Sequence, residues 1–229
     1  MDSEIWRWSA EEMAYAIRTR RISSREALTS VLGRVGQVNP RVNAIVDLLA
    51  DEALATADRA DKAVRAREPL GVLHGVPVTV KINVDYAGRA TTNGVVAYKE
   101  LIAKQDSASV ANLRKAGAVI FGRTNVPAFS HRYFTDNDLH GRTLNPWSPE
   151  RTPGGSSGGA AVAVATGMGP IAHGNDRAGS VRVPAHACGI FGLRPSMGRV
   201  PDYSPGAAEE RGLFSQLTNV QGPLARSIR

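Results

Sequence analysis

A cluster of four glycines around two serines, in residues 153–159 (PGGSSGG), constrains the fold of this chain more than any other segment. Glycine adopts backbone conformations that other residues avoid, and it lets the main chain approach neighbouring groups closely. The cluster therefore predicts a sharply turned backbone that brings N–H groups and hydroxyls to one point. Because glycine–serine segments alone are more often flexible loops, the interpretation depends on residues elsewhere in the chain.

Lys81 and Ser180 are the two residues that turn this cluster into a catalytic hypothesis. Lys81 follows the apolar run 76–80, and burial at the end of such a strand lowers the pKa of a lysine until it can act as a base. Ser180 lies directly after Gly179, where the backbone can approach a substrate closely. A hydroxyl donates and accepts hydrogen bonds, so Ser156 can relay a proton between Lys81 and Ser180. These are the parts of a hydrolase with a serine nucleophile and a lysine base.

Amide hydrolysis also needs hydrogen-bond donors for the negative charge that develops on the carbonyl oxygen. We expect these donors to be the successive backbone N–H groups of Arg177, Ala178, Gly179 and Ser180. We expect further support for the site from Gly154, Gly155, Ser157, Asp176 and Arg182. Cys188 is the alternative nucleophile, but its apolar neighbours and the missing base indicate a buried thiol with a packing role.

The spacing of apolar residues predicts an α/β fold. Ser9 and Ser23 each begin a capping box, and the helix after Ser23 is expected to end at Asn39-Pro40. Residues 129–152 are expected to form a long polar surface loop. Further helices are expected over residues 107–116 and 159–166, and strands over residues 76–80, 118–121, 171–173 and 190–193. Helix-then-strand units of this kind predict a mixed, twisted sheet covered by helices.

Composition and charge exclude several classes of protein. The chain has 229 residues with 42% hydrophobic content, enough for a substantial core, and it has no run of about 18 apolar residues that would span a membrane. The formal net charge is +7, but the arginines are scattered and no basic run alternates with aromatic residues, so no nucleic-acid partner is expected. The single cysteine fits a reducing environment, and we expect a cytoplasmic protein. The five histidines lack the spacing of metal ligands, and no metal or other cofactor is expected.

The order and spacing of the motifs resemble those of the amidase signature family, from about Ser9 to the last residue. The matching motifs are GVPVTVK (75–81), GRTN (122–125), GGSSGG (154–159), GSVRVPA (179–185), GLRP (192–195), GRVP (198–201) and GPLARS (222–227). The resemblance implies an α/β fold of the amidase signature type. It implies one partial domain over residues 1–229, with core motifs at 70–201 and an incomplete C-terminus.

The resemblance also implies a mechanism. Lys81 would be the base, Ser156 the bridging serine that follows a cis peptide bond, and Ser180 the nucleophile that forms an acyl-enzyme. The implied reaction converts a small carboxylic amide to an acid and ammonia or an amine. A membrane partner is not expected, and a homodimer is left open.

Two features depart from the family pattern. Residues 176–180 read Asp-Arg-Ala-Gly-Ser, whereas the family usually has Asp-x-Gly-Gly-Ser, so Ala178 replaces a glycine and Arg177 brings a long cation to the acyl pocket. If position 178 needs a positive φ, alanine costs about 1 kcal/mol there. The chain also stops where family members continue for roughly as many residues again.

Two other functions stay open at this point. A glutaminase-type subunit of a tRNA-dependent amidotransferase shares the same core, although residues 126–129 (VPAF) differ from the usual Met-Asp-Glu-Phe. A truncated, non-catalytic remnant or binding protein is the other alternative, suggested by Arg177, Ala178 and the short length. Ammonia release from glutamine, with and without partner subunits, distinguishes the first from an amidase. Labelling of Ser180 by a fluorophosphonate distinguishes an enzyme, which reacts, from a non-catalytic protein, which does not.

Overall fold

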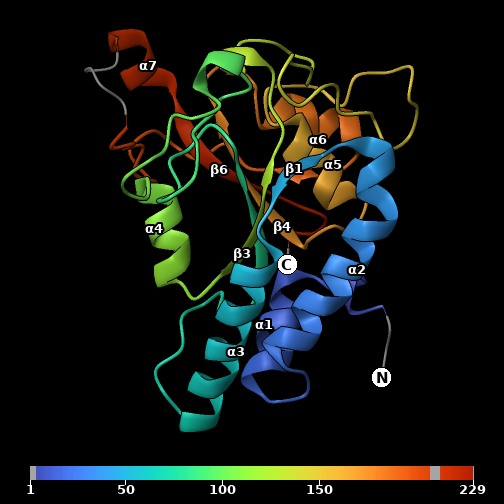
Figure 1. The fold of residues 1–229 in the computed structure, drawn as a ribbon, viewed down its shortest axis with the longest axis vertical. Helices are drawn as coiled ribbons and strands as arrows, with labels where there is room; N and C mark the ends of the chain where they lie inside the picture. The colour runs from blue at the N-terminus through green and yellow to red at the C-terminus, as the bar shows by residue number, and fades with distance from the viewer. Residues whose placement is uncertain (1–3, 207–211, 229) are drawn as a thin grey trace.

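The computed structural model describes residues 4–206 and 212–228, and a six-stranded sheet forms its centre (Figure 1). The strands follow the order β1-β3-β2-β4-β6-β5 across the sheet. Their bounds are β1 Ile45–Leu48, β2 Pro77–Lys81, β3 Val119–Thr124, β4 Ile171–Asp176, β5 Phe191–Gly192 and β6 Val220–Ala225. The central strands β3, β2 and β4 run parallel, whereas β1, β6 and β5 pair antiparallel with their neighbours. The predicted mixed sheet is therefore confirmed.

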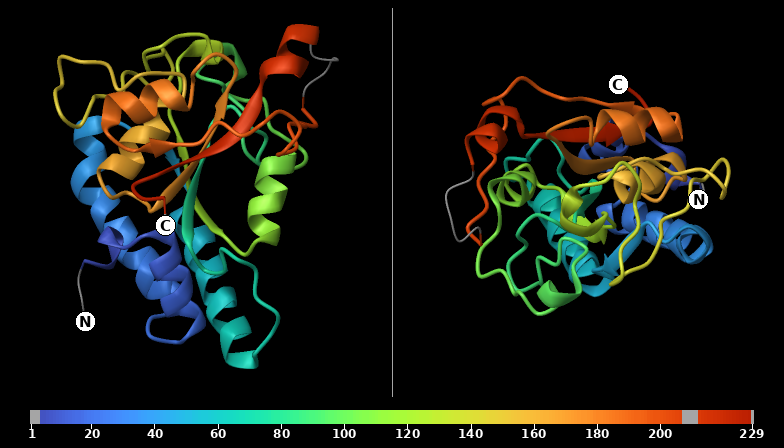
Figure 2. Two further views of the ribbon diagram at one scale, coloured as in Figure 1. Left: turned by 180° about the vertical axis from the view of Figure 1, so that it is seen from behind. Right: turned by 90° about the horizontal axis from the view of Figure 1, so that it is seen from above.

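Helices cover both faces of this sheet. Figures 1 and 2 show α4 on one side and α2, α5 and α6 on the other. The helices are α1 Ala10–Arg18, α2 Ser24–Val42, α3 Ala50–Ala66, α4 Ala108–Lys115, α5 Gly158–Ala165, α6 Arg182–Cys188 and α7 Leu213–Thr218, with 3-10 turns η1 Ile5–Arg7, η2 Val96–Tyr98 and η3 Ala128–Ser130. Within the described ranges, no helix combines the length and the apolar character needed to cross a membrane.

Neighbouring residues of β3 enter two different apolar cores. Val119 and Phe121 join the larger core, which includes buried residues of α1, α2, α3 and α5. Ile120, between them, packs in a smaller core with Val110 of α4. Successive side chains of a strand point to opposite faces, so a strand buried on both faces carries a continuous apolar run. This explains why the predicted strand at residues 118–121 shows no polar alternation.

Local signals predicted the starts of the first two helices correctly. The side chains of Ser9 and Ser23 accept the backbone N–H groups of Glu12 and Glu26, and both capping boxes are complete. A capping box satisfies two backbone donors that a helix otherwise leaves unpaired at its start. The other two predicted helices correspond to α4 and α5.

The predicted end of α2 at Asn39-Pro40 is wrong, because the helix continues to Val42. Pro40 lies in the last turn, where its missing N–H removes a single hydrogen bond of the helix. The Asn39 Oδ1 atom accepts the N–H groups of Ala44 and Ile45, at 2.9 Å each. This side chain therefore caps the passage from α2 into β1, beyond the proline.

The loop predicted over residues 129–152 has little regular structure, but it is more than a surface loop. Four of its polar side chains are buried: Thr135, Asn137, Thr143 and Asn145. The Thr135 Oγ1 atom donates to the backbone oxygen of Gly154 at 2.9 Å, and Asn145 Nδ2 donates to Thr152 O at 3.0 Å. Buried polar groups of this kind satisfy a backbone that has no secondary structure. The loop therefore packs against the glycine–serine cluster and holds it in place.

Candidate active site

The predicted catalytic residues converge at one edge of the sheet. Strand β2 ends at Lys81 and its parallel neighbour β4 ends at Asp176, so their carboxyl ends lie together. Helix α5 begins at Gly158, directly after Ser156 and Ser157, and packs against β2 and β4. In open α/β sheets, ligands bind beyond the carboxyl ends of the parallel strands. The fold thus brings three segments that are distant in sequence to the place where such a sheet accepts a ligand.

The Lys81 side chain is the buried amine of this site, with 0% of its surface exposed. Its Nζ atom lies 2.7 Å from Ser156 Oγ and 2.7 Å from Asn175 Oδ1. Burial lowers the pKa of Lys81 to about 7, and the negative charge of Asp176 opposes this shift. An amine with a pKa of about 7 is neutral in much of the population near neutral pH, so it can accept a proton.

Close contacts explain the glycines of the cluster. A Cβ atom on Gly154 would lie 2.8 Å from the Pro184 Cα atom, and Gly154 has a φ of +79°. A Cβ atom on Gly155 would lie 2.4 Å from the backbone oxygen of Arg132. The peptide bond between Gly155 and Ser156 is cis, as the family resemblance implies. No side chain fits at either position without movement of the backbone that surrounds it.

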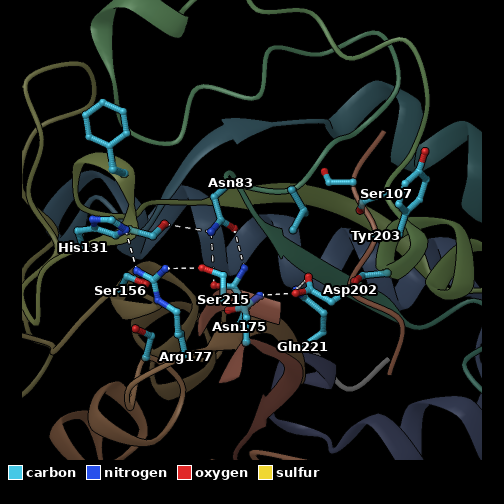
Figure 3. A pocket seen from close by; sticks show the side chains of 17 residues that line it. Asn83, Ser107, His131, Ser156, Asn175, Arg177, Asp202, Tyr203, Ser215 and Gln221 are labelled. Atoms are coloured by element: carbon cyan, nitrogen blue, oxygen red, sulfur yellow. Dashed lines mark hydrogen bonds between the residues drawn. The ribbon is translucent and has the colours of Figure 1, made fainter. Parts of the chain in front are cut away.

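Ser157 connects the cluster to the segment that carries Ser180. Its N–H donates to Ser180 O at 3.2 Å, and its Oγ atom donates to Asn175 O at 3.4 Å. Ser156 and Ser180 both line an open pocket of about 180 Å³, which Asn83 and Asn175 also line. Figure 3 shows Ser156 in this pocket beside the side chains that surround it. The pocket therefore contains two of the three predicted catalytic residues, and Lys81 lies directly behind Ser156.

A buried carboxylate holds the turn that contains Ser180. Asp176 accepts the N–H groups of Gly179 at 2.7 Å and Val181 at 3.1 Å. The Arg182 guanidinium donates to both carboxylate oxygens, at 3.0 Å each. Burial would raise the pKa of Asp176, but hydrogen bonds from the Arg182 side chain and from the backbone hold that pKa at about 2. Asp176 therefore stays ionised and fixes the turn.

The four expected oxyanion donors differ in what they contact. The Gly179 N–H is directed at Asp176, and Gly179 itself has a φ of +115°. Ala178 is not among the described non-glycine residues with a positive φ, so alanine does not bring the strain that a left-handed position would cause. The N–H groups of Arg177, Ala178 and Ser180 stay the candidates for the oxyanion site.

Sequence reasoning missed two asparagines next to the lysine. The Asn175 Oδ1 atom accepts from Lys81 Nζ, while its Nδ2 atom donates to Asn83 Oδ1 at 3.1 Å. Asn83 Nδ2 in turn donates to Ser130 Oγ at 3.0 Å. Both asparagines lie at or just beyond the carboxyl end of a parallel strand, and this position was the available signal. The amine thus belongs to a chain of hydrogen bonds that crosses the pocket wall.

A buried histidine supports the backbone of Lys81. The His173 Nδ1 atom accepts the Lys81 N–H at 3.4 Å, and its Nε2 atom lies 2.7 Å from Gln221 Oε1. Burial lowers the pKa of His173 to about 4, so the ring is neutral at neutral pH. A neutral ring adds no positive charge beside the lysine. Neither His173 nor Gln221 was predicted to lie at the site.

We expect the Asn175→Asp substitution to move the pH profile of acylation to higher pH. A carboxylate 2.7 Å from Lys81 Nζ would stabilise the charged amine and raise its pKa by about 1–3 units. The rate of Ser180 labelling by a fluorophosphonate, measured across pH, checks this shift. Asn175→Ala is the matched control, because it removes the same hydrogen bond without adding charge. A midpoint that is equal in the two variants would contradict the prediction.

Cys188 is not placed to act as a nucleophile. Its thiol is buried and lies 3.6 Å from the backbone oxygen of Pro153. Burial raises the pKa of the Cys188 thiol to about 12, which leaves it protonated. This supports the predicted packing role. Within residues 4–206 and 212–228, no group of three or more His, Cys, Asp or Glu side chains is arranged to hold a metal ion.

Comparisons with known proteins agree with this geometry. The profile of the amidase family matches residues 26–229. The chain is 53% identical to an indoleacetamide hydrolase of Bradyrhizobium diazoefficiens over 98% of this chain and 43% of that protein. It is 38% identical to a glutamyl-tRNA(Gln) amidotransferase subunit of Cyanothece over 96% of this chain and 44% of that protein. The crystal structure of a bacterial aryl acylamidase of the amidase signature family superimposes with a TM-score of 0.89 and 34% identity, over 96% of this chain and 45% of that chain. The chain thus spans less than half the length of these relatives.

Proposed function

The chain belongs to the amidase signature family, and we propose that it provides the catalytic centre of an enzyme that hydrolyses a carboxylic amide through an acyl-enzyme on Ser180. The observation that carries the proposal is the fully buried Lys81 amine, 2.7 Å from Ser156 Oγ, with a pKa lowered to about 7. An amine in this state accepts a proton from a hydroxyl and later returns it. In this proposal residues 1–229 form part of one amidase domain.

In the proposed acylation step, the contact between Lys81 Nζ and Ser156 Oγ provides the last part of the proton path. Ser180 Oγ attacks the amide carbonyl carbon and gives its proton to Ser156, whose own proton passes to Lys81 Nζ. The negative charge on the former carbonyl oxygen is stabilised by backbone N–H groups of the 177–180 turn. The protonated Lys81 then returns a proton through Ser156 to the leaving nitrogen, and the carbon–nitrogen bond breaks. Ammonia or an amine departs, and the acyl group stays on Ser180 as an ester.

The second half of the reaction uses the same groups in the reverse direction. Neutral Lys81 accepts a proton, through Ser156, from a water molecule that attacks the ester carbon. The acid is released when the bond to Ser180 Oγ breaks and the proton returns to that oxygen. Asp176 takes no proton in this scheme, because its pKa of about 2 keeps it ionised. Its task is to hold the turn that carries Ser180.

The glutaminase alternative is favoured by one observation, the 38% identity to a glutamyl-tRNA(Gln) amidotransferase subunit. The site itself supports both functions, since each needs the same nucleophile and base. The segment at residues 126–129 differs from the pattern expected for that kind of subunit, and the identity to an indoleacetamide hydrolase is higher. We therefore propose an amidase that acts without partner subunits.

An ammonia-release assay tests the proposal. We expect the purified protein alone to release ammonia from small primary amides, with indole-3-acetamide and butanamide as probes, and to do so faster than from glutamine. The Ser180→Ala variant is the control for background hydrolysis. Ammonia that appears only from glutamine, and only after amidotransferase partner subunits are added, would support the alternative instead. Absence of both ammonia release and Ser180 labelling would identify a non-catalytic protein.

A further inference from the structure

A second hollow adjoins the catalytic pocket, and the nucleophile lies on the wall of both. This hollow has a volume of about 290 Å³ and lies between the loop at residues 130–133 and the turn at residues 177–180. Its lining residues are Ser130, His131, Arg132, Tyr133, Arg177, Ala178 and Ser180. The lining thus has two arginines but no carboxylate. A concave surface of one charge sign concentrates ligands of the opposite sign.

Arg177 lines both cavities, as do Ser130, His131 and Ser180. Its Nη1 atom donates to Ser215 Oγ at 2.9 Å, and its Nη2 atom lies 2.8 Å from His131 Nε2. Neither partner carries a negative charge, and no ion pair joins Arg177 to a carboxylate of the described residues. A guanidinium has five N–H donors in a planar fork that matches a carboxylate. The two contacts hold the Arg177 side chain in place while leaving other donors for a ligand.

The catalytic pocket is polarised along its length. Figure 3 shows Arg177 and His131 at one end, and Asp202 with Gln221 at the other. The Asp202 carboxylate accepts from Asn219 Nδ2 at 2.6 Å and also from the Gln221 amide. A ligand carboxylate would be repelled at the Asp202 end and attracted at the Arg177 end. The charge distribution therefore selects where an anionic group can lie.

We propose that Arg177 recognises a carboxylate carried by the amide substrate, and that the hollow beside Ser180 is the subsite for this group. This inference rests on the proposed function and narrows its substrate to amides with a carboxylate close to the scissile bond. The carboxylate belongs either to the acyl part, as in the half-amide of a dicarboxylic acid, or to the amine part, as in an N-acyl amino acid. The chemistry that Arg177 recognises is the same in both.

The alternative role for Arg177 is structural, because it links the 130–133 loop to α7 through His131 and Ser215. A purely structural residue would affect charged and neutral substrates to the same extent. The ratio of kcat/KM between a carboxylate amide and its neutral counterpart separates the two roles. This ratio is measured within each variant, so a general loss of activity cancels.

The experiment compares two matched pairs of substrates. Succinamate against butanamide places the carboxylate on the acyl part, and N-butanoylglycine against the neutral N-propylbutanamide places it on the amine part. We expect one pair to show a preference of about tenfold or more for the carboxylate, as one charge-assisted hydrogen bond provides. Arg177→Gln should bring this ratio close to one by raising KM for the anionic substrate, while Arg177→Lys should keep part of it. Arg65→Gln, an exposed arginine of α3, is the control and should leave the ratio unchanged.

Binding of succinate, measured by calorimetry, gives a readout that does not need turnover. We expect the dissociation constant to rise by about tenfold in Arg177→Gln, with no change in Arg65→Gln. If no amide is cleaved but succinate binding depends on Arg177, the subsite stands and the proposed amidase activity fails. If amides are cleaved with equal ratios in the original protein and in Arg177→Gln, the carboxylate subsite is wrong and the amidase proposal stands.

Discussion

Replacing Lys81 by arginine is expected to lower the rate of acylation by about 10²- to 10⁴-fold. An arginine stays protonated in proteins, so it cannot accept the proton that Ser156 passes on. The position is fully buried, and the larger guanidinium has to fit between Ser156 and Asn175. Lys81→Met is therefore made in parallel, because it keeps a similar length without charge and also lacks a base. Both variants should show the same loss in a burst-phase or labelling assay, and thermal unfolding checks that each one is folded.

In the unmodified protein, the rate of acylation should depend on pH in the way that a neutral Lys81 base requires. Lys81 must be neutral to act as a base, and its neutral fraction grows as the pH rises through its pKa of about 7. Acylation is therefore expected to increase from about pH 5.5 to about pH 8.5 and then to level off. Lys62→Arg, at an exposed position of α3, should reproduce the profile of the unmodified protein. Acylation by Lys81→Arg at a near-normal rate, or a profile without a rise near pH 7, would exclude Lys81 as the base.

The sequence predicted those parts of the molecule that depend on neighbouring residues. The capping boxes at Ser9 and Ser23 each need residues only three positions apart, and both helices begin where expected. The strand before Lys81 was evident from its apolar run, since both of its faces are buried. The glycine–serine cluster indicated a tight backbone, and the close contacts of Gly154 and Gly155 now account for it.

The parts that sequence reasoning missed depend on contacts between distant segments. Asn175 and Asn83 become part of the site only because β2 and β4 are parallel neighbours, and their positions at the strand ends do not by themselves show that the two strands are adjacent. Strand β6 was not predicted, because its Gly222 and Pro223 are residues that disfavour strands. It forms because its antiparallel pairing with β4 stabilises it, over the register from Ile171↔Ala225 to Asp176↔Val220.

Pro40 and Ala178 also show that a local sequence pattern does not determine the backbone conformation of a single residue. A proline after an asparagine indicates the end of a helix, but it cannot show that α2 continues to Val42 or that the Asn39 side chain caps the passage into β1. An alanine in place of a glycine suggests strain only if the backbone is left-handed, and the structure gives Ala178 no positive φ. The concern about this substitution therefore disappears. For Arg177, the departure from the family pattern leads instead to the hypothesis that its side chain recognises a carboxylate of the substrate.

Replacing Ser180 by alanine is expected to abolish the covalent adduct that a fluorophosphonate forms with the protein. In the unmodified protein, Ser180 Oγ attacks phosphorus, a P–O bond forms and fluoride leaves, so mass spectrometry of the peptide that carries Ser180 shows the added mass. Alanine has no nucleophile at this position, and amide turnover should fall by about 10⁴-fold or more, as for other serine hydrolases that lose their nucleophile. The substitution removes one hydroxyl from the pocket wall and keeps the backbone N–H of the turn, so the fold should be retained.

Two further variants identify the hydroxyl or thiol that reacts with the fluorophosphonate. Cys188→Ala removes the buried thiol, whose raised pKa of about 12 leaves it unreactive, and this variant should be labelled like the unmodified protein. Ser156→Ala should slow labelling, because it interrupts the proton path from Ser180 to Lys81, yet any adduct that does form should still lie on Ser180. Peptide mapping distinguishes the three residues directly. An adduct on Ser156 or Cys188, or labelling that persists in Ser180→Ala, would show that the nucleophile has been assigned to the wrong residue.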